Sequence, residues 1–471
     1  CGRHLPGNRW VHRLPPVMPR WPRRIRLTLA AIAFSAVQVH AQAVLNPEQM
    51  RELASQAVLQ GQAGLAFDLT GALIDRDDTD LDAHLIRSRA ARNLGRNDEA
   101  LTHARRAWAL AEGEQARYAA ALAMAQALSS SGRRTAAQLW LRRAVQIAPN
   151  DALEARAAAD FRYVRRQNPW STALRFSVSP SSNINNDSRN ETSELFGLPF
   201  EFALEGEARA LSGVEVSAGF STRYRLVNTD RKRTDLLFGL SHRTYVLSDE
   251  AKDIAPDADG SDFATSSVFV GLQENYALPG GKARLGWDAR IGRTWYGGDP
   301  LLTYNRIGAT YRRTAGDRGM FNLAISLEGQ DGETGRDDAT IWSAHVGYGM
   351  ALASGNTLSV STTFTESESD ADYLDYTLRA ISARYGLAKP IGPAQLEFGL
   401  TLSEKRHERS NLTTDGRDER SIKATVTAAL PDMDFYGFIP TITLNAERTD
   451  ANIDLYETEN FGIQLGIRSA F

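Results

Sequence analysis

The sequence has 471 residues, a formal net charge of -3 at neutral pH and 42% hydrophobic residues. This length exceeds that of one small domain, so at least two domains are expected, and the nearly balanced charge gives no electrostatic reason to expect nucleic acid as a partner. Composition excludes neither a soluble protein nor a membrane barrel, because the lipid-facing residues of a barrel alternate with polar ones.

Residues 1–43 are expected to be an extension followed by an export signal. Basic residues between Arg20 and Arg26 precede an apolar run from Leu27 to Val39 and a small-residue cleavage site at 41–43. The mature chain is expected to lack the single cysteine, Cys1, and therefore to have no disulfide and no thiolate chemistry. The rest of the sequence has no run of about 18 apolar residues, so no transmembrane helix is predicted after the export signal.

Residues 46–166 predict an all-α domain, because strong helix formers dominate and apolar positions recur at helical spacing. Three glycines, separated by 34 and 37 residues, are each followed five positions later by an alanine: Gly61, Gly95, Gly132, Ala66, Ala100 and Ala137. The pattern resembles the tetratricopeptide repeat, and we expect the three-residue excess in a loop near residues 112–114. Three such repeats can bury a continuous core and present a concave peptide-binding surface; a passive spacer or barrel plug is the alternative.

Residues 170–471 predict an antiparallel β-barrel. From Val214 to Leu226 one face is largely apolar and the other polar, and this alternation continues to the end of the chain. A soluble sandwich would also alternate, but long strands with charged inner faces favour a transmembrane barrel. We expect 14 strands, with 16 as the alternative. The segments between Ser171 and Leu211 are out of phase with the rest, because they do not fit the alternation of short turns and long loops at the strand ends.

The connections between strands are expected to alternate in length. Short turns near Gly280, Gly355 and Gly392 suit the periplasmic side, whereas longer polar stretches at 247–261, 331–338 and 408–419 suit the outside. The last strand resembles the signal read by the bacterial barrel-assembly machinery, because outward residues alternate up to a terminal aromatic: Phe461, Ile463, Leu465, Ile467 and Phe471. Phe398 is expected to face lipid in the middle of its strand.

No catalytic, cofactor-binding or metal-binding residues are predicted, and the protein is not expected to be an enzyme. The histidines are scattered without metal-ligand spacing, and the sequence has no nucleophile elbow and no phosphate loop. The acidic stretch at 257–262 contains oxygen ligands but lacks the spacing of a calcium loop. It is interpreted as an external loop.

Where the barrel begins, Trp170 opens the first strand and an Asn-x-Asn element follows at Asn183 and Asn185. Together with the order of export signal, helical repeats and barrel, this start resembles that of surface lipoprotein assembly modulators, the Slam family. The resemblance implies an outer-membrane protein that helps move lipoproteins, or secreted haem- and metal-scavenging proteins, from the periplasm to the cell surface. No catalytic residues are implied.

The expected partners are outer-membrane lipid, a client protein, the barrel-assembly machinery and a periplasmic chaperone. The client's path would be the inner barrel surface, and its expected charged residues are Glu201, Glu205, Glu207, Arg209, Arg223, Arg225, Arg284, Asp288 and Arg290. Two other functions remain open. An exopolysaccharide exporter also joins periplasmic repeats to a barrel, usually with more repeats, and a porin-like channel would leave the helices without a role.

Overall fold

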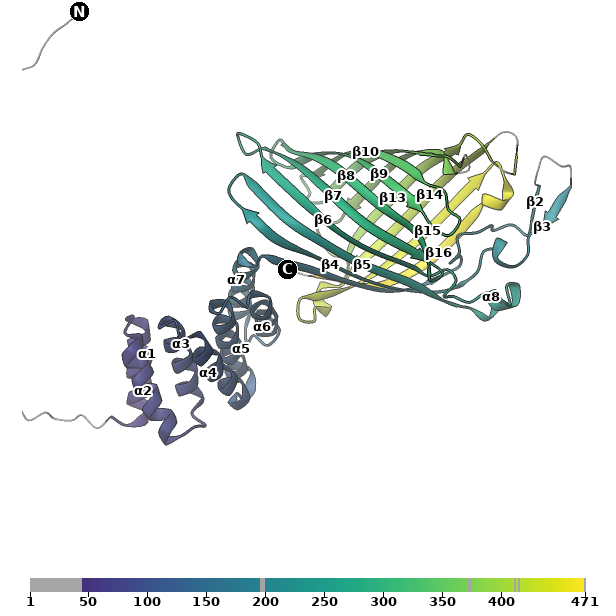
Figure 1. Cartoon of the computed structure of the whole chain (residues 1–471). Helices are drawn as coiled ribbons and strands as arrows, with labels where there is room; N and C mark the ends of the chain where they lie inside the picture. Colours follow the sequence, from purple (N-terminus) through teal and green to yellow (C-terminus); the bar gives the residue numbers. More distant parts are fainter. Residues whose placement is uncertain (1–44, 195–199, 372–373, 411, 414–415, 470–471) are drawn as a thin grey trace, which may run out of the picture. The chain divides into compact units, whose positions relative to one another are not determined.

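The computed structural model describes residues 45–194, 200–371, 374–410, 412–413 and 416–469 (Figure 1). The expected export signal and Phe471 lie outside these residues. Residues 47–471 form one compact unit, in which helices precede strands along the chain. None of the described helices is both long and apolar enough to cross a membrane.

Seven helices occupy the first part of this unit. They are α1 (Pro47–Leu59), α2 (Ala63–Arg76), α3 (Leu81–Asn93), α4 (Asn97–Leu110), α5 (Gly113–Ser130), α6 (Arg134–Gln146) and α7 (Asp151–Gln167). Gly61, Gly95 and Gly132 lie in the turns α1–α2, α3–α4 and α5–α6, with φ values of 78°, 77° and 78°. A side chain would be strained in this left-handed conformation, so each helix pair turns on a glycine.

The helical core is built from small side chains. Ala66, Ala100 and Ala137 each have 0% exposed surface, and they lie near the start of the second helix of each pair. Small residues allow neighbouring helices to approach closely, so these positions set the spacing of the stack. The longer third repeat is explained by α5, which has 18 residues where α1 and α3 have 13, and not by an enlarged loop as expected.

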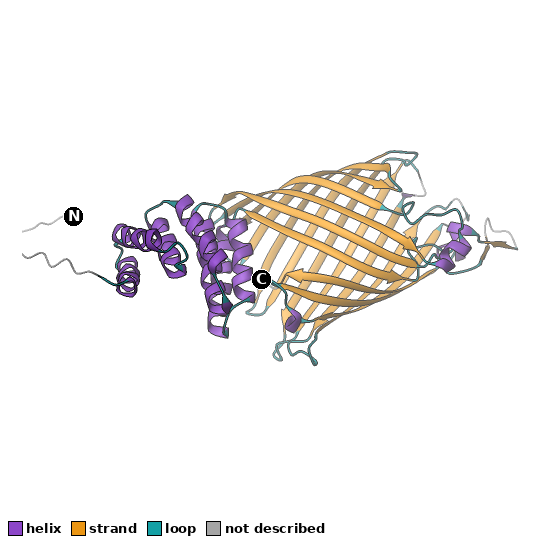
Figure 2. Ribbon diagram, turned by 90° about the horizontal axis from the view of Figure 1, so that it is seen from below, coloured by secondary structure: helices purple, strands orange, loops and turns teal. Residues whose placement is uncertain are grey.

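Fourteen strands form a closed antiparallel barrel, which confirms the predicted fold class (Figure 2). The strands are β1 (Trp170–Ser181), β4 (Gly213–Asn228), β5 (Lys232–Leu247), β6 (Thr265–Ala277), β7 (Ala283–Tyr296), β8 (Asp299–Ala315), β9 (Gly319–Gly332), β10 (Ala339–Ala351), β11 (Thr357–Ser369), β12 (Tyr376–Gly386), β13 (Gln395–His407), β14 (Arg417–Ala429), β15 (Phe438–Ala451) and β16 (Thr458–Ser469). Each strand pairs with its sequence neighbour in the wall, and β1 closes the circle between β4 and β16.

Two short strands lie outside this wall. β2 (Thr192–Glu194) and β3 (Glu201–Ala203) pair only with each other, within the connection 182–212 that joins β1 to β4. This connection explains why the region between Ser171 and Leu211 was out of phase. The region contains one barrel strand, β1, followed by this long connection.

The two rims of the barrel differ in their connections. We call the rim where β1 begins the proximal rim and the opposite one the distal rim. The turns at 278–282, 352–356 and 387–394 lie at the proximal rim, whereas the connections 182–212, 248–264, 333–338 and 408–416 lie at the distal rim. The distal connection 248–264 contains a further helix, α8 (Asp249–Ile254), which packs against Leu211 and Leu247 in a small apolar cluster.

The outer surface of the barrel carries a belt of exposed apolar side chains. On β16, Phe461, Ile463, Leu465 and Ile467 are 55%, 38%, 52% and 45% exposed. Aromatic residues gather toward the proximal end of the belt, at Trp170, Tyr224, Tyr276, Tyr311, Phe321, Tyr348, Tyr385 and Phe398. An apolar outer band with aromatic residues at its edge is what a strand-built wall requires in lipid, so the barrel is transmembrane.

Phe398 is closer to the edge of this belt than expected. It is the fourth residue of β13, where it pairs with Tyr385 and Val426, and Leu400 and Leu402 follow it on the same face. Toward the distal end of the same face the outer positions become charged, and Glu404 there lies 3.6 Å from Arg420. The middle of the apolar band on this strand is therefore Leu400.

Candidate functional site

One half of the inner wall, from β10 round to β1, is lined with hydroxyl groups. They hydrogen-bond in pairs across neighbouring strands, at positions that alternate with the apolar belt. The pairs are Ser343 with Thr365 (3.0 Å), Ser382 with Thr401 (2.9 Å), Ser421 with Thr449 (2.7 Å), Thr427 with Thr443 (3.0 Å) and Ser177 with Ser217 (2.6 Å). This half of the lumen is polar and carries charges of both signs: Arg384, Glu397 and Lys405 also point inward, and Lys423 lies 2.6 Å from Glu447 across β14 and β15.

The other half, from β4 to β8, is rich in arginine. Its inward positions hold Arg223, Arg225, Arg233, Arg243, Arg284, Arg290, Arg306 and Arg312. Some of them are paired with carboxylates: Arg233 lies 2.6 Å from Asp235, Arg290 lies 2.9 Å from Asp288, and Arg243 lies 3.4 Å from Glu215. Positive charge exceeds negative charge on this half of the wall.

The expected lumen residues are thus placed only in part. Arg223, Arg225, Arg284, Asp288 and Arg290 are inward on the wall, as the alternation predicted. The other four belong to the distal connection: Glu201 to β3, Glu205 and Arg209 to its loops, and Glu207 to a short 3₁₀ turn. The prediction was wrong for these four because the short β2–β3 hairpin mimics barrel alternation.

Glycines on the arginine-rich half, from β4 to β8, leave space for aromatic rings to lie along the wall. A Cβ atom at Gly239 would collide with the ring of Phe269, and one at Gly292 would meet Tyr304 at 2.5 Å. Phe269 and Tyr304 border a recess of about 260 Å³ together with Arg175. These glycines keep two large inward side chains against the wall instead of across the lumen.

The Asn-x-Asn element folds the start of the distal connection. The Asn183 side chain is 2% exposed, and its amide donates to the backbone oxygen of Asp187 at 2.9 Å. The Asn185 amide donates to the backbone oxygens of Glu207 and Arg209, and its oxygen accepts from the Leu211 backbone at 2.9 Å. Both asparagines therefore satisfy backbone groups of a long loop.

A half-buried carboxyl group lies beside this element. Burial, and secondarily the charge of Glu207, raise the pKa of Asp187 to about 6. Nearby, the guanidinium of Arg189 binds Glu457 at 2.7 Å and Asp450 at 3.1 Å, which connects the distal connection to the β15–β16 end of the wall. Trp170, the third residue of the family-like start, opens β1 and packs against Tyr224 with ring centroids 4.7 Å apart.

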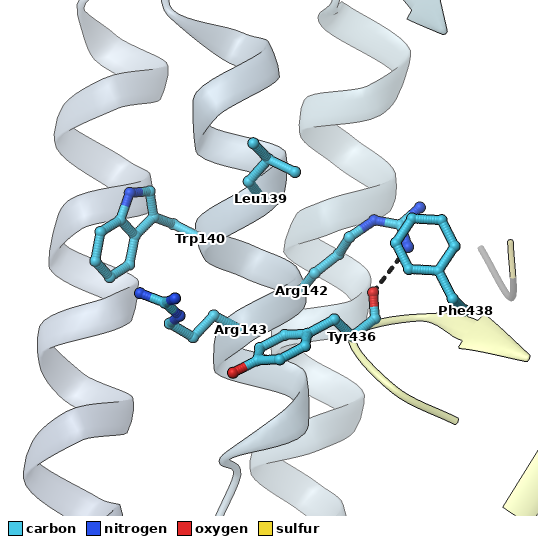
Figure 3. A pocket seen from close by; sticks show the side chains of 6 residues that line it. All are labelled: Leu139, Trp140, Arg142, Arg143, Tyr436 and Phe438. Carbon is cyan, nitrogen blue, oxygen red and sulfur yellow. Dashed lines mark hydrogen bonds between the residues drawn. The ribbon is translucent and has the colours of Figure 1, made fainter. Parts of the chain in front are cut away.

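A second candidate site lies at α6 and the β14–β15 connection. The guanidinium of Arg142 donates to the backbone oxygens of Tyr436 and Gly437 at 2.8 and 2.9 Å (Figure 3). It also lies 4.6 Å from the ring centre of Phe438, and the Gln146 side chain accepts from the Tyr436 backbone at 2.8 Å. Helix α6 therefore binds the tip of this turn through backbone oxygens of Tyr436 and Gly437 and through the backbone N–H of Tyr436.

The held turn has a specific backbone shape. Tyr436 and Gly437 have φ values of 51° and 76°, and Phe435 and Phe438 exchange two backbone hydrogen bonds of 3.0 Å. Two successive left-handed residues form the tight hairpin turn that matches strand twist, although tyrosine rarely adopts this conformation. The turn borders a pocket of about 310 Å³, in which Arg143 lies between Trp140 and Tyr436 (Figure 3).

Sequence reasoning missed Arg142 and Tyr436. Arg142 is one of many arginines in a helix, and nothing in its spacing distinguishes it. The pair Tyr436-Gly437 carried a weak signal, because a glycine directly before a strand is typical of a hairpin turn. The partner of that turn could not be predicted, since the two segments are almost 300 residues apart.

Polar side chains also meet inside the helical repeats. Arg87 donates to His103 at 3.1 Å, the two rings of His103 and His84 approach within 3.0 Å through their Nδ1 atoms, and His84 bonds the backbone oxygen of Asp78. Burial, followed by the charges of Arg87 and His84, lowers the pKa of His103 to about 4. The imidazole is therefore neutral near pH 7. Within the described residues no group of three or more His, Cys, Asp or Glu side chains could hold a metal.

No family model matches the sequence, and no curated protein matches it. Among solved structures, an outer membrane channel from Pseudomonas putida F1 is 13% identical and covers 63% of this chain and 94% of its own, with a TM-score of 0.31. A bacterial polysaccharide outer membrane secretin is 10% identical, with 63% and 98% covered and a TM-score of 0.33. The type III secretion translocator chaperone SycD of Yersinia enterocolitica is 18% identical over 26% of this chain and 92% of its own, with a TM-score of 0.24. These similarities do not assign a family.

Proposed function

We propose that the protein is an outer-membrane translocator that helps deliver a client protein from the periplasm to the cell surface. The client would be a lipoprotein or a secreted haem- or metal-scavenging protein. One observation carries the proposal: a single chain joins a stack of helical repeats to a closed barrel with a polar inner wall, and α6 holds a proximal turn of that barrel. Repeat stacks are suited to peptide contacts, and a polar lumen offers a path through lipid.

The orientation follows from the connections. Barrels of this class place short turns in the periplasm and long loops outside, so the proximal rim and the helical repeats that precede it would be periplasmic. The expected export signal at residues 1–43 agrees with this location. The similarity of Trp170, Asn183 and Asn185 to the Slam barrel start supports the choice of client class, and the proposal needs no catalytic residue and no cofactor.

The experiment compares three variants of the protein in cells that also produce a lipoprotein encoded by an adjacent gene. Deletion of residues 46–166 should leave a barrel that inserts, because its strands are intact, but should abolish exposure of the client to protease added to whole cells. Arg142→Ala should reduce client exposure, because it removes the contact with Tyr436 and Gly437. Arg162→Ala, a change at an exposed arginine of α7, is the matched control and should have no effect.

Heat-modifiable migration of the barrel on a gel reports insertion in every form. Normal client exposure without the repeats would refute recruitment by the helical domain. Failure with every protein client, together with loss of exported polymer in the deletion strain, would favour the exopolysaccharide exporter. Solute uptake that is unchanged by the deletion would favour a porin-like channel.

A further inference from the structure

Five inward arginines gather at the proximal mouth of the barrel lumen. We name them the arginine collar: Arg223 and Arg225 on β4, Arg233 on β5, Arg284 on β7 and Arg312 on β8. All lie within a few residues of the strand ends that meet the proximal rim. The strand neighbours Tyr224, Leu285 and Tyr311 belong to the outer face, so the alternating pleat turns the collar toward the lumen.

The pairing of the strands brings like charges together. Arg284 on β7 lies directly opposite Arg312 on β8, as do Arg290 and Arg306 at the next level of the wall. Like charges at directly opposite positions destabilise a sheet, because their side chains extend from neighbouring points on one face. At the level of Arg290 and Arg306, which is farther from the proximal rim, carboxylates offset the positive charge. Asp288 binds Arg290, and Glu328 lies opposite Arg306.

At the collar the positive charge is not offset in this way. Asp235 is 1% exposed, and its carboxylate lies 2.6 Å from Arg233. The other four arginines have no carboxylate within ion-pairing distance among the described residues. Arg225 donates to the backbone oxygen of Arg166 at 2.8 Å, and Arg312 donates to the Asn322 side chain at 3.2 Å. The Nε atoms of Arg223 and Arg225 are buried and lack a hydrogen-bond partner within the described chain.

We propose that the arginine collar is a binding site for carboxylate-bearing polyanions, and specifically for an acidic stretch of polypeptide that enters the lumen at the proximal rim. Guanidinium groups bind carboxylates through paired, charge-assisted hydrogen bonds, and several of them on a low-dielectric wall concentrate the positive field. Because the side chains face the lumen and not the lipid, the ligand comes from the aqueous path. The polypeptide part of this proposal rests on the translocator function, whereas the polyanion site does not.

The experiment uses full-length protein in detergent and in planar bilayers. A fluorescent oligoglutamate peptide should bind with an affinity that falls steeply with salt, and Arg284→Gln with Arg312→Gln should weaken binding by about tenfold. Arg284→Lys with Arg312→Lys keeps the charge and should retain most of the binding. Arg420→Gln, on the outer face, is the matched control and should bind like the unaltered protein. Chloride should permeate better than potassium, less so in the glutamine variant.

Each outcome bears on the site. Equal peptide affinity in the glutamine variant and the unaltered protein would overturn it, as would equal binding of oligoglutamine. Competition by citrate as strong as that by oligoglutamate would overturn the polypeptide part, because a small anion would then suffice. Binding in detergent does not require conductance or a client, so failure of client delivery in cells leaves this result interpretable.

Discussion

The helical repeats and the barrel place their apolar residues in opposite ways. In the repeats the core residues are fully enclosed, as Ala66, Ala100 and Ala137 show with 0% exposure. In the barrel the large apolar side chains point outward, and Leu400 is 44% exposed while Leu465 is 52% exposed. The repeats exclude water from their interior, whereas the barrel excludes it only when lipid covers its outer wall.

This contrast shows that burial depends on the solvent that each region meets. The repeats are stabilised by small residues packed closely between helices. A side chain that does not fit this packing lowers their free energy of unfolding. The barrel stabilises its backbone by closing every strand pair, and its side chains need only match lipid outside and water inside. A charge is therefore tolerated on one barrel face and costly on the other, within a single strand.

The largest expected effect is on the outer face of β13. Leu400→Arg should lower the free energy of unfolding of the lipid-reconstituted barrel by about 2 to 4 kcal/mol, because a charge would enter the middle of the apolar band. Thr401→Arg, one residue along and inward, should cost far less. Denaturant titration of both variants measures the difference. Equal losses would show that the two faces do not differ as described, and Phe398→Arg should give an intermediate loss because it lies nearer the edge.

A smaller effect is expected from overfilling the helical core. Ala100→Leu should destabilise the repeats by about 1 to 3 kcal/mol, since the enclosed site has no room for a larger side chain. Thr102→Leu, at an exposed position of the same helix α4, should be nearly neutral. Thermal melting of the helical circular dichroism signal checks both. The apolar clusters of the repeats include no barrel residue among the described residues, so a barrel transition that moved together with the helical one would contradict this prediction.

The smallest effect concerns pH. His103 has a folded pKa of about 4 and an ordinary value of 6.5 in the unfolded chain. Between these values the unfolded chain binds a proton that the folded repeats do not, so stability falls as the pH is lowered from about 6.5 toward 4. Helical melting temperatures should decline over this window and do so less in His103→Gln. The strand signal should not follow, and an identical decline in the variant would exclude His103 as the cause.

Local patterns predicted the regular parts of both regions. Glycine spacing identified the helix pairs, because few residues other than glycine adopt the left-handed conformation at Gly61, Gly95 and Gly132. Strand alternation, together with the even strand number of bacterial barrels, predicted the 14 strands. Phe461 and the outward residues of β16 were visible for the same reason. These features depend on residues close in sequence.

Features that depend on distant residues were predicted poorly. The β2–β3 hairpin was mistaken for part of the wall, since alternation over three residues does not say which strand is the partner. Asn183 and Asn185 were singled out by resemblance, yet their bonds within a long loop became visible only in the fold. The arginine collar could be anticipated as inward charge, but the opposition of Arg284 and Arg312 required the register.

Among the described residues, the seam between the first and last strands, β1 and β16, has the fewest paired positions in the wall. β1 is matched to β4 along its whole length, from Trp170 to Ser181, whereas its match to β16 comprises Ser177 with Gly466, Val178 with Leu465 and Ser181 with Gly462. Two of the three β16 partners are glycines, which contribute no side chain to the joint. Local opening has its lowest free energy where the fewest bonds must break, so amide protons along this seam should exchange sooner than those elsewhere in the wall, and unzipping of the barrel would begin there.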